Sequence, residues 1–159
     1  MHLLIKKMNR KMAADILKWT YEPPYDFYNM ELTEGNIIGM LSNSYYALVN
    51  DKGRLTGFFC LGKPAQVPNG PMQEAYLENM IDIGLGMNPH FTGKGAGSEF
   101  FSYIVYHVRI GFPNMPLRLT VASFNKRAVR VYQKAGFVEA VRFDKGGVTF
   151  KVMVNNGCL

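Results

Sequence analysis

Residues 80–98 read MIDIGLGMNPHFTGKGAGS and join an apolar, strand-like segment to a glycine-dense turn. The strand-like part ends at Pro89, and the glycines lie within residues 93–97. Behind them, apolar residues recur at three- and four-residue spacing and predict a helix: Phe100, Phe101, Ile104, Val105 and Val108. Glycines at such a junction let a ligand approach the backbone, and the first N–H groups of the helix have no intrahelical partner. The stretch therefore predicts an anion site, most simply for phosphate.

Two common phosphate-binding motifs do not fit this turn. A Walker A loop requires Ser or Thr after its lysine, whereas Lys94 is followed by Gly95, so ordinary use of nucleoside triphosphates is not expected. A dinucleotide-binding loop requires G-x-G-x-x-G, and the run that begins at Gly93 reaches Ser98 without the third glycine. Taken alone, the turn leaves open a simple chain reversal.

A second informative stretch, residues 120–137, reads TVASFNKRAVRVYQKAGF and has the pattern of a strand followed by a helix. Asn125 is a favourable N-cap, and Gly136 is a natural helix stop. Between them runs one apolar stripe at helical spacing, formed by Ala128, Val131, Tyr132 and Ala135. Taken alone, this pattern favours a half-buried core position for Tyr132.

Together the two stretches resemble the signatures of the GNAT superfamily of N-acetyltransferases. Residues 92–97 fit the acetyl-CoA pyrophosphate motif Q/R-x-x-G-x-G/A at Gly95 and Gly97, with Thr92 where the family usually has Gln or Arg. The second stretch matches the family's other signature at Asn125, Ala128, Tyr132, Gly136 and Phe137. The chain is similar to ribosomal-protein alanine N-acetyltransferases, and the resemblance implies an α/β (α+β mixed) fold with a mixed, mostly antiparallel sheet flanked by helices.

The resemblance also implies direct transfer of an acetyl group from acetyl-CoA to a primary amine in a ternary complex. The pantetheine arm would pair with the strand end at Leu85, Gly86 and Met87, where a backbone N–H holds the acetyl oxygen. Tyr132 stands where the family has the general acid for the leaving thiolate. The implied cofactor-binding residues are Leu85, Gly86, Met87, Thr92, Gly93, Lys94, Gly95, Ala96, Gly97, Ser98, Asn125 and Tyr132. Gly84 and Gly86 are poor strand formers and fit a bulge or a close ligand approach.

The general base is expected to be a carboxylate, because an ammonium acceptor must lose a proton before it attacks. The ribosomal-protein relatives carry a Glu for which this chain has Thr120, and the difference argues against a ribosomal-protein substrate. Asp82 on the predicted central strand is the leading candidate, and a hydrogen-bonded structural carboxylate is its alternative. Glu78 is the reserve candidate, because in a strand its side chain would point to the same side as that of Asp82. A water-mediated route stays open.

The acceptor is expected to bind at residues 19–30, WTYEPPYDFYNM, which the resemblance assigns to the acceptor-side loop. Trp19, Tyr25 and Tyr28 would line the site, while Glu22 and Asp26 would attract a cation. The same aromatics equally fit a proline-rich loop pinned to the core. A peptide N-terminus, a polyamine, an amino sugar and a small antibiotic all stay open.

Composition predicts one compact domain over residues 1–159, with 48% apolar residues, and the resemblance implies that it is a single N-acetyltransferase domain. No apolar run approaches the roughly 20 residues of a membrane span, and MHLLIKKMNRK lacks a signal-peptide pattern. Cys60 and Cys158 suggest neither a disulfide framework nor a metal site, so a cytoplasmic location is expected. The net charge of +6 includes basic residues beside Asn125 that suit coenzyme A phosphates and equally fit a solvated helix face. No membrane partner is expected, and a homodimer stays open. A non-catalytic acyl-CoA-binding module is the main alternative, ahead of a basic nucleic-acid-binding domain.

The remaining secondary structure follows from apolar periodicity and turn residues. Helices are predicted over residues 10–19 and 34–41. Strands are predicted over residues 3–7, 44–50, 55–62, 75–87, 117–123, 138–143 and 149–154, with a loop over residues 63–72 and a turn at Gly146 and Gly147.

Overall fold

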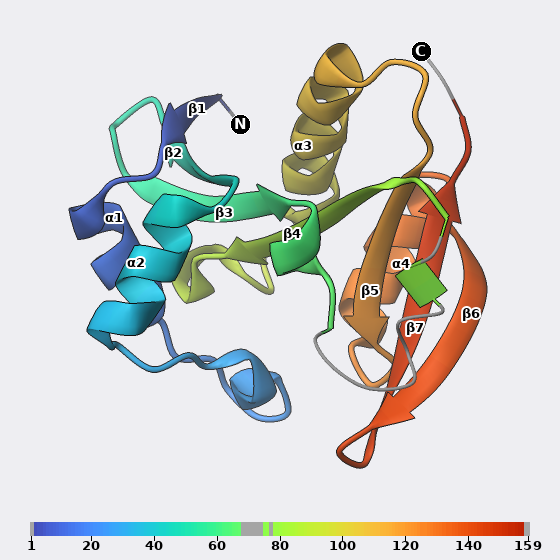
Figure 1. The fold of residues 1–159 in the computed structure, drawn as a ribbon. Helices are drawn as coiled ribbons and strands as arrows, with labels where there is room; N and C mark the ends of the chain where they lie inside the picture. Colours follow the sequence, from blue (N-terminus) through green and yellow to red (C-terminus); the bar gives the residue numbers. More distant parts are fainter. Residues whose placement is uncertain (1, 68–74, 77, 158–159) are drawn as a thin grey trace. The chain divides into compact units, whose positions relative to one another are not determined.

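The computed structural model describes residues 2–67, 75–76 and 78–157 (Figure 1). Contacts divide the chain into two compact units, Met1–Cys60 with Leu85–Ala96, and Leu61–Gly84 with Gly97–Leu159. Strand β4 (Ile81–Met87) begins in the second unit and ends in the first. The single domain over residues 1–159 stays a prediction.

The first unit contains a three-stranded antiparallel arrangement in the order β1-β2-β3, with two helices. Its elements are β1 (Leu3–Lys7), α1 (Arg10–Leu17), the 3₁₀ turn η1 (Tyr25–Tyr28), α2 (Glu34–Ser42), β2 (Tyr45–Asn50), β3 (Leu55–Leu61) and the 3₁₀ turn η4 (Pro89–Phe91). Asn9 and Thr33 cap the two helices by accepting from the N–H groups of Met12 and Asn36. Buried residues of α1, α2, β2 and β3 form one apolar cluster, which holds the two adjacent helices in place.

The second unit contains strands in the order β4-β5-β7-β6, two helices and the short turn η2 (Lys63–Ala65). Its other elements are α3 (Gly97–Gly111), β5 (Leu117–Ala122), α4 (Lys126–Lys134), β6 (Val138–Lys145) and β7 (Val148–Asn155). The start of β4 pairs with β5 in parallel, Ile81 opposite Leu117, whereas β5–β7 and β6–β7 are antiparallel. Phe100, Phe101 and Ile104 of α3 are fully buried in this unit. The predicted mixed, mostly antiparallel α/β class is confirmed.

Most predicted elements agree with the structure to within two residues, but the central strand does not. It was predicted over residues 75–87, and it begins at Ile81. Residues 75–76 lie in a 3₁₀ turn, and Glu78 precedes the strand with its side chain exposed. The parity argument that paired Glu78 with Asp82 was therefore wrong, because Glu78 does not share the strand's two-residue alternation.

Within the described residues, no helix combines the length and the apolar character needed to cross a bilayer.

Candidate active site

The glycine-rich loop after β4 has an open, glycine-dependent backbone. Gly93 and Gly95 have φ angles of +71° and +79°, a region that side chains with a Cβ rarely adopt. A Cβ built on Gly95 would meet nothing within 4 Å. Gly93, Lys94 and Gly95 are exposed, and the next helix, α3, begins two residues after Gly95. A ligand could therefore reach this stretch of main chain without displacing described protein atoms.

The start of the loop is fixed by Asn88, a residue that sequence reasoning did not select. Its N–H donates to the carbonyl of Thr56 at 2.8 Å, and its Nδ2 donates to the carbonyl of Leu55 at 2.9 Å. Its Oδ1 accepts from the N–H of His90 at 3.0 Å. Thr92 donates its hydroxyl to the carbonyl of Pro89 at 2.9 Å. These bonds tie the loop entry to β3 and leave the glycines beyond it uncovered.

One predicted site glycine, Gly86, has a packing role, and another, Gly97, lies at an ordinary van der Waals distance from its neighbour. A Cβ on Gly86 would lie 2.4 Å from Cε1 of Phe58, so the ring of Phe58 takes the space that any side chain would need. A Cβ on Gly97 would lie 3.4 Å from Cγ2 of Val131, at the contact of α3 with α4. The close approach predicted at Gly86 is thus made by Phe58 of the chain itself.

Residues 19–30 are tied to the end of β4 by a hydrogen bond that the sequence did not predict. The hydroxyl of Tyr21 donates to the carbonyl of Met87 at 2.7 Å, and the N–H of Tyr21 donates to Oδ1 of Asn29 at 2.8 Å. Burial raises the pKa of Tyr21 to about 12, so its phenol remains a donor at neutral pH. Tyr21 therefore anchors the segment beside Leu85–Met87 within the first unit, and no local sequence signal distinguished it from its aromatic neighbours.

The three aromatics predicted to bind the acceptor differ in their surroundings. Trp19 is partly buried against the apolar cluster, and its ring centroid lies 6.2 Å from that of Phe58. Tyr25 and Tyr28 are half-buried in η1, where the ring of Phe27 meets that of Tyr28 edge-on at 5.2 Å. Trp19 thus also pins the segment to the core, as the alternative interpretation expected.

Asp82, the leading base candidate, lies in a buried ion pair of the second unit. Its Oδ1 accepts from Nε of Arg118 at 2.6 Å and its Oδ2 from Nη2 at 2.8 Å, with both side chains at most 4% exposed. Nε2 of Gln66 donates to the same Oδ2 at 2.9 Å. The hydrogen bonds with Asp82 raise the pKa of Arg118 above its ordinary value. A buried carboxylate held by three donors is poorly suited to accept a substrate proton, which favours the structural alternative for Asp82.

The same ion pair organises the chain on either side of residues 68–74. Nη1 of Arg118 donates to the carbonyls of Ala75 at 3.4 Å and Glu78 at 3.1 Å, and its guanidinium lies 5.1 Å from the ring centroid of Tyr76. The Tyr76 hydroxyl is 2.8 Å from Oγ1 of Thr120 and accepts from the N–H of Val67 at 3.1 Å. The sequence could not show this cluster, because its members are far apart in the chain.

The second signature forms helix α4 as predicted. Oδ1 of Asn125 accepts from the N–H of Ala128 at 3.1 Å, and Gly136 follows the helix with a φ of +92°. Tyr132 is 9% exposed, and its ring centroid lies 4.7 Å from that of Phe101. The helix thus holds Tyr132 in a well-packed position.

Comparison with known proteins decides the family. The acetyltransferase (GNAT) family profile matches residues 10–137. The chain belongs to the GNAT acetyltransferase family. The predicted enzyme class is therefore confirmed, and GNAT acetyltransferases in general use acetyl-CoA. Among curated proteins, none matches the sequence of this GNAT acetyltransferase.

Solved structures share the GNAT fold at low sequence identity. A protein from Bordetella pertussis that is described as a GNAT-family acetyltransferase matches with a TM-score of 0.72 and 14% sequence identity. The match covers 96% of this chain and 94% of the other. Mutant forms of the spermidine/spermine N-acetyltransferase from Vibrio cholerae match with a TM-score of 0.67 and 17% sequence identity, over 97% of this chain and 94% of the other. A protein from Salmonella typhimurium that is described as an acetyltransferase was solved with its cofactor acetyl-CoA. It matches with a TM-score of 0.64 and 14% sequence identity, over 98% of this chain and 94% of the other.

Proposed function

We propose that this GNAT protein transfers an acetyl group from acetyl-CoA directly to a primary amine, either a peptide N-terminus or a small amine. The observation that carries the cofactor assignment is the loop at Gly93 and Gly95, which has an open backbone and runs directly into the 15-residue helix α3. Helix N-termini that follow such loops favour phosphate groups.

For the cofactor, the proposal assigns the pyrophosphate to the main chain of residues 92–98, with the exposed Lys94 supplying positive charge. The pantetheine arm is assigned to Leu85–Met87, and Asn125 remains a cofactor contact by family resemblance. When bound, acetyl-CoA supplies the activated thioester. The free space at Gly95 supports this assignment, because the loop has room on the side where a Cβ would project.

For proton transfer, the proposal assigns the general acid to Tyr132, whose tight packing against Phe101 would fix its phenol. Asp82 is better explained as a structural residue, because Arg118 and Gln66 already use its oxygens. The amine would then lose its proton to water or to the exposed Glu78.

For the acceptor, the proposal keeps Trp19, Tyr25 and Tyr28 as the lining of the amine site. Its support is the Tyr21 hydrogen bond, which holds this segment at the end of β4 where the thioester is assigned. The amine itself is to be identified by assay. The buried thiol of Cys60 suits a reducing compartment, and a cytoplasmic location belongs to the same proposal.

The test combines a thermal-shift measurement with a free-thiol release assay over a panel of amines and peptides. Acetyl-CoA at a hundredfold excess over its Kd should stabilise the protein by about 2.7 kcal/mol. Gly95→Val should abolish that stabilisation by filling the space assigned to the pyrophosphate. Gly53→Val is the matched control, since Gly53 has a φ of +75°, is exposed and also has nothing within 4 Å of its Cβ position.

The outcomes separate the proposals. If Gly95→Val and Gly53→Val keep the same acetyl-CoA stabilisation, the loop does not bind the cofactor. If acetyl-CoA binds but no amine in the panel releases thiol, the non-catalytic acyl-CoA-binding module is the better description. Stabilisation by acetyl-CoA with amine-dependent thiol release supports the proposed enzyme.

A further inference from the structure

Asn155, the last residue of β7, connects three parts of the second unit through one side chain. Its Nδ2 donates to the carbonyl of Ala135 at 3.1 Å, and its Oδ1 accepts from Nη2 of Arg109 at 3.2 Å and from the N–H of Gly157 at 2.8 Å. A carbonyl oxygen can only accept and an N–H can only donate, so these partners fix which end of the amide is nitrogen. The side chain therefore joins the C-terminal end of α4 to α3.

Arg109 supports this amide from α3. It is 5% exposed, and its Nη1 donates to the carbonyl of Met115 at 3.0 Å while its Nη2 donates to Asn155. Among the described residues, its hydrogen-bond partners are carbonyl and amide oxygens, and none is a carboxylate. A buried guanidinium that is held by neutral oxygens depends on each of them, because an unsatisfied buried charge is costly. Arg109 therefore holds the Asn155 amide in one orientation.

The carbonyl that Asn155 holds belongs to the residue that ends α4. The N–H of Ala135 donates to the carbonyl of Tyr132 at 3.1 Å, and the N–H of Phe137 donates to the same carbonyl at 3.0 Å. Gly136 lies between them with a φ of +92°, and a Cβ on it would lie 3.2 Å from Nδ2 of Asn155. Asn155 thus packs closely against the end of the helix, next to the backbone of Tyr132.

The ring of Tyr132 is coupled to this end of α4 by close packing. Its centroid lies 4.7 Å from that of Phe101 on α3, and the ring of Phe137 lies 5.5 Å from that of Phe101. Phe101 and Phe137 are each 1% exposed, and close-packed interiors transmit small displacements. A shift of the last turn of α4 would therefore also displace the phenol of Tyr132.

We propose that Arg109 and Asn155 are positioning residues for Tyr132 and act through the carbonyl of Ala135. This inference rests on the proposed function, in which Tyr132 gives its hydroxyl proton to the leaving thiolate. A general acid has to lie within hydrogen-bond reach, about 2.6–3.2 Å, of the atom that it protonates. A displacement of about 1 Å can cost about 10²-fold in rate. The rate of acetyl transfer therefore depends on a side chain that is assigned to neither substrate nor cofactor.

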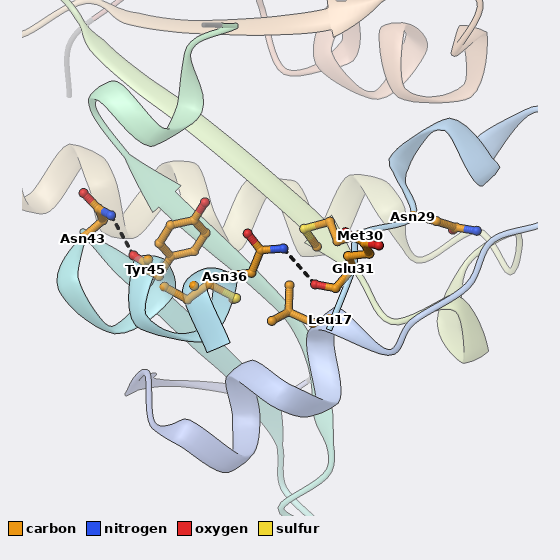
Figure 2. A pocket seen from close by; sticks show the side chains of 10 residues that line it. Leu17, Asn29, Met30, Glu31, Asn36, Asn43 and Tyr45 are labelled. Carbon is orange, nitrogen blue, oxygen red and sulfur yellow. Dashed lines mark hydrogen bonds between the residues drawn. The ribbon is translucent and has the colours of Figure 1, made fainter. Parts of the chain in front are cut away.

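The main test variant is Asn155→Asp. A carboxylate has no proton to donate, so the bond to the Ala135 carbonyl is lost, while both acceptor bonds and the shape of the side chain are kept. Arg109 gains a charged partner at the same position, which favours retention of the fold. Asn43→Asp is the matched control, because it changes the charge equally and removes a bond of the same kind, from Nδ2 of Asn43 to the carbonyl of Gly39 at 2.6 Å (Figure 2).

Kinetics separate a positioning role from a general loss of structure. Thiol release is measured per folded molecule, with the amine of the panel that releases most thiol and the folded fraction taken from circular dichroism. Asn155→Asp should lower kcat about tenfold in the original chain but less than about twofold in Tyr132→Phe, with the KM for acetyl-CoA unchanged. Asn43→Asp should leave kcat unchanged in either background. Independent effects multiply, so unequal factors show that Asn155 acts through the phenol of Tyr132.

A second measurement requires no acceptor. In the full chain labelled with ¹³C at Cζ of tyrosine, the NMR signal that is lost in Tyr132→Phe belongs to Tyr132. Asn155→Asp should shift this signal, and Asn43→Asp should leave it in place. Arg109→Lys keeps the charge but loses the planar fork, and should shift the signal less. If Asn155→Asp does not fold, Arg109→Lys also serves the kinetic test, with a smaller loss of kcat that disappears in Tyr132→Phe.

The outcomes separate this inference from the proposed function. Near-normal kcat in Tyr132→Phe would overturn the acid assignment, and the positioning role with it. If Tyr132→Phe is slow but Asn155→Asp lowers kcat by equal factors in both backgrounds, only the positioning role is overturned. Unchanged kcat in Asn155→Asp, or a Tyr132 signal that does not move, would also overturn it. An effect on kcat that disappears in Tyr132→Phe supports it.

Discussion

Replacing Asp82 tests whether its pair with Arg118 is structural or catalytic. Asp82→Ala removes two charge-assisted hydrogen bonds from Arg118, each contributing about 1.5–3 kcal/mol, and leaves the guanidinium buried without its counter-ion. The sum, about 3–6 kcal/mol, agrees with the roughly 3–5 kcal/mol typical of a broken buried pair. Against a usual total stability of about 5–15 kcal/mol, much of the folded state would be lost. Asp82→Asn keeps the shape and should lose less stability.

The assay is urea unfolding followed by circular dichroism, with kcat measured per folded molecule across pH. We expect Asp82→Asn to lower the free energy of unfolding and leave the pH profile of kcat unchanged. Glu139→Gln is the control, because the pair of Glu139 with Arg142 is partly exposed and should contribute under about 1 kcal/mol. The double variant Asp82→Leu with Arg118→Met should recover much of the stability that Asp82→Ala loses, since it leaves no unpaired charge.

One result would refute this reasoning. If Asp82→Asn unfolds at the same urea concentration as the original chain, while its kcat falls at low pH and recovers as the amine deprotonates, Asp82 is the general base. The buried pair would then be a means of orienting a catalytic carboxylate.

Three further predictions concern single side chains. Gly86→Ala should destabilise the protein by about 1–3 kcal/mol in urea unfolding, because its Cβ would overlap the ring of Phe58. Adding Phe58→Leu should recover part of the lost stability. Unchanged stability of Gly86→Ala would mean that the ring moves freely. Tyr21→Phe should lose about 1 kcal/mol with its bond to Met87. Because the folded-state pKa of Tyr21 is about 12 and the unfolded value about 10, the stabilisation from its phenol is complete below pH 10 and falls as the pH rises towards 12. The free energy of unfolding, measured over that pH range, should therefore fall less steeply in Tyr21→Phe than in the original chain. Equal slopes would contradict the assignment. Tyr132→Phe should lower kcat about 10²–10⁴-fold with acetyl-CoA binding retained, and near-normal turnover would remove Tyr132 as the acid.

Features with local signals could be predicted from the sequence. The N-cap at Asn125 and the helix stop at Gly136 depend on residues within one turn, and both are confirmed. The two sequence signatures likewise indicated the GNAT family, because their spacing is a property of short segments. The start of β4 was predicted six residues too early, since apolar residues before Ile81 continue the pattern although the chain there is turned.

Features that depend on distant partners could not be predicted. Asp82 looked like a base candidate because its partner, Arg118, lies 36 residues away in the chain. Gly86 fitted a ligand approach as well as a packing contact, and only the position of Phe58 on another strand distinguishes them. The hydrogen bond from Tyr21 to Met87 joins residues that are 66 positions apart, and no local sequence pattern predicts it. For such residues, the sequence shows the chemical type of the side chain but not the residue with which it interacts.

The cluster around Arg118 has a consequence for how this protein can change in evolution. Gln66 and Val67 are hydrogen-bonded to Asp82 and to Tyr76, and the carbonyls of Ala75 and Glu78 accept from Arg118. A substitution at Arg118 would therefore remove support from Asp82, Ala75 and Glu78 at the same time. Because a lone buried charge is strongly destabilising, Arg118 and Asp82 are expected to be replaced together rather than one at a time.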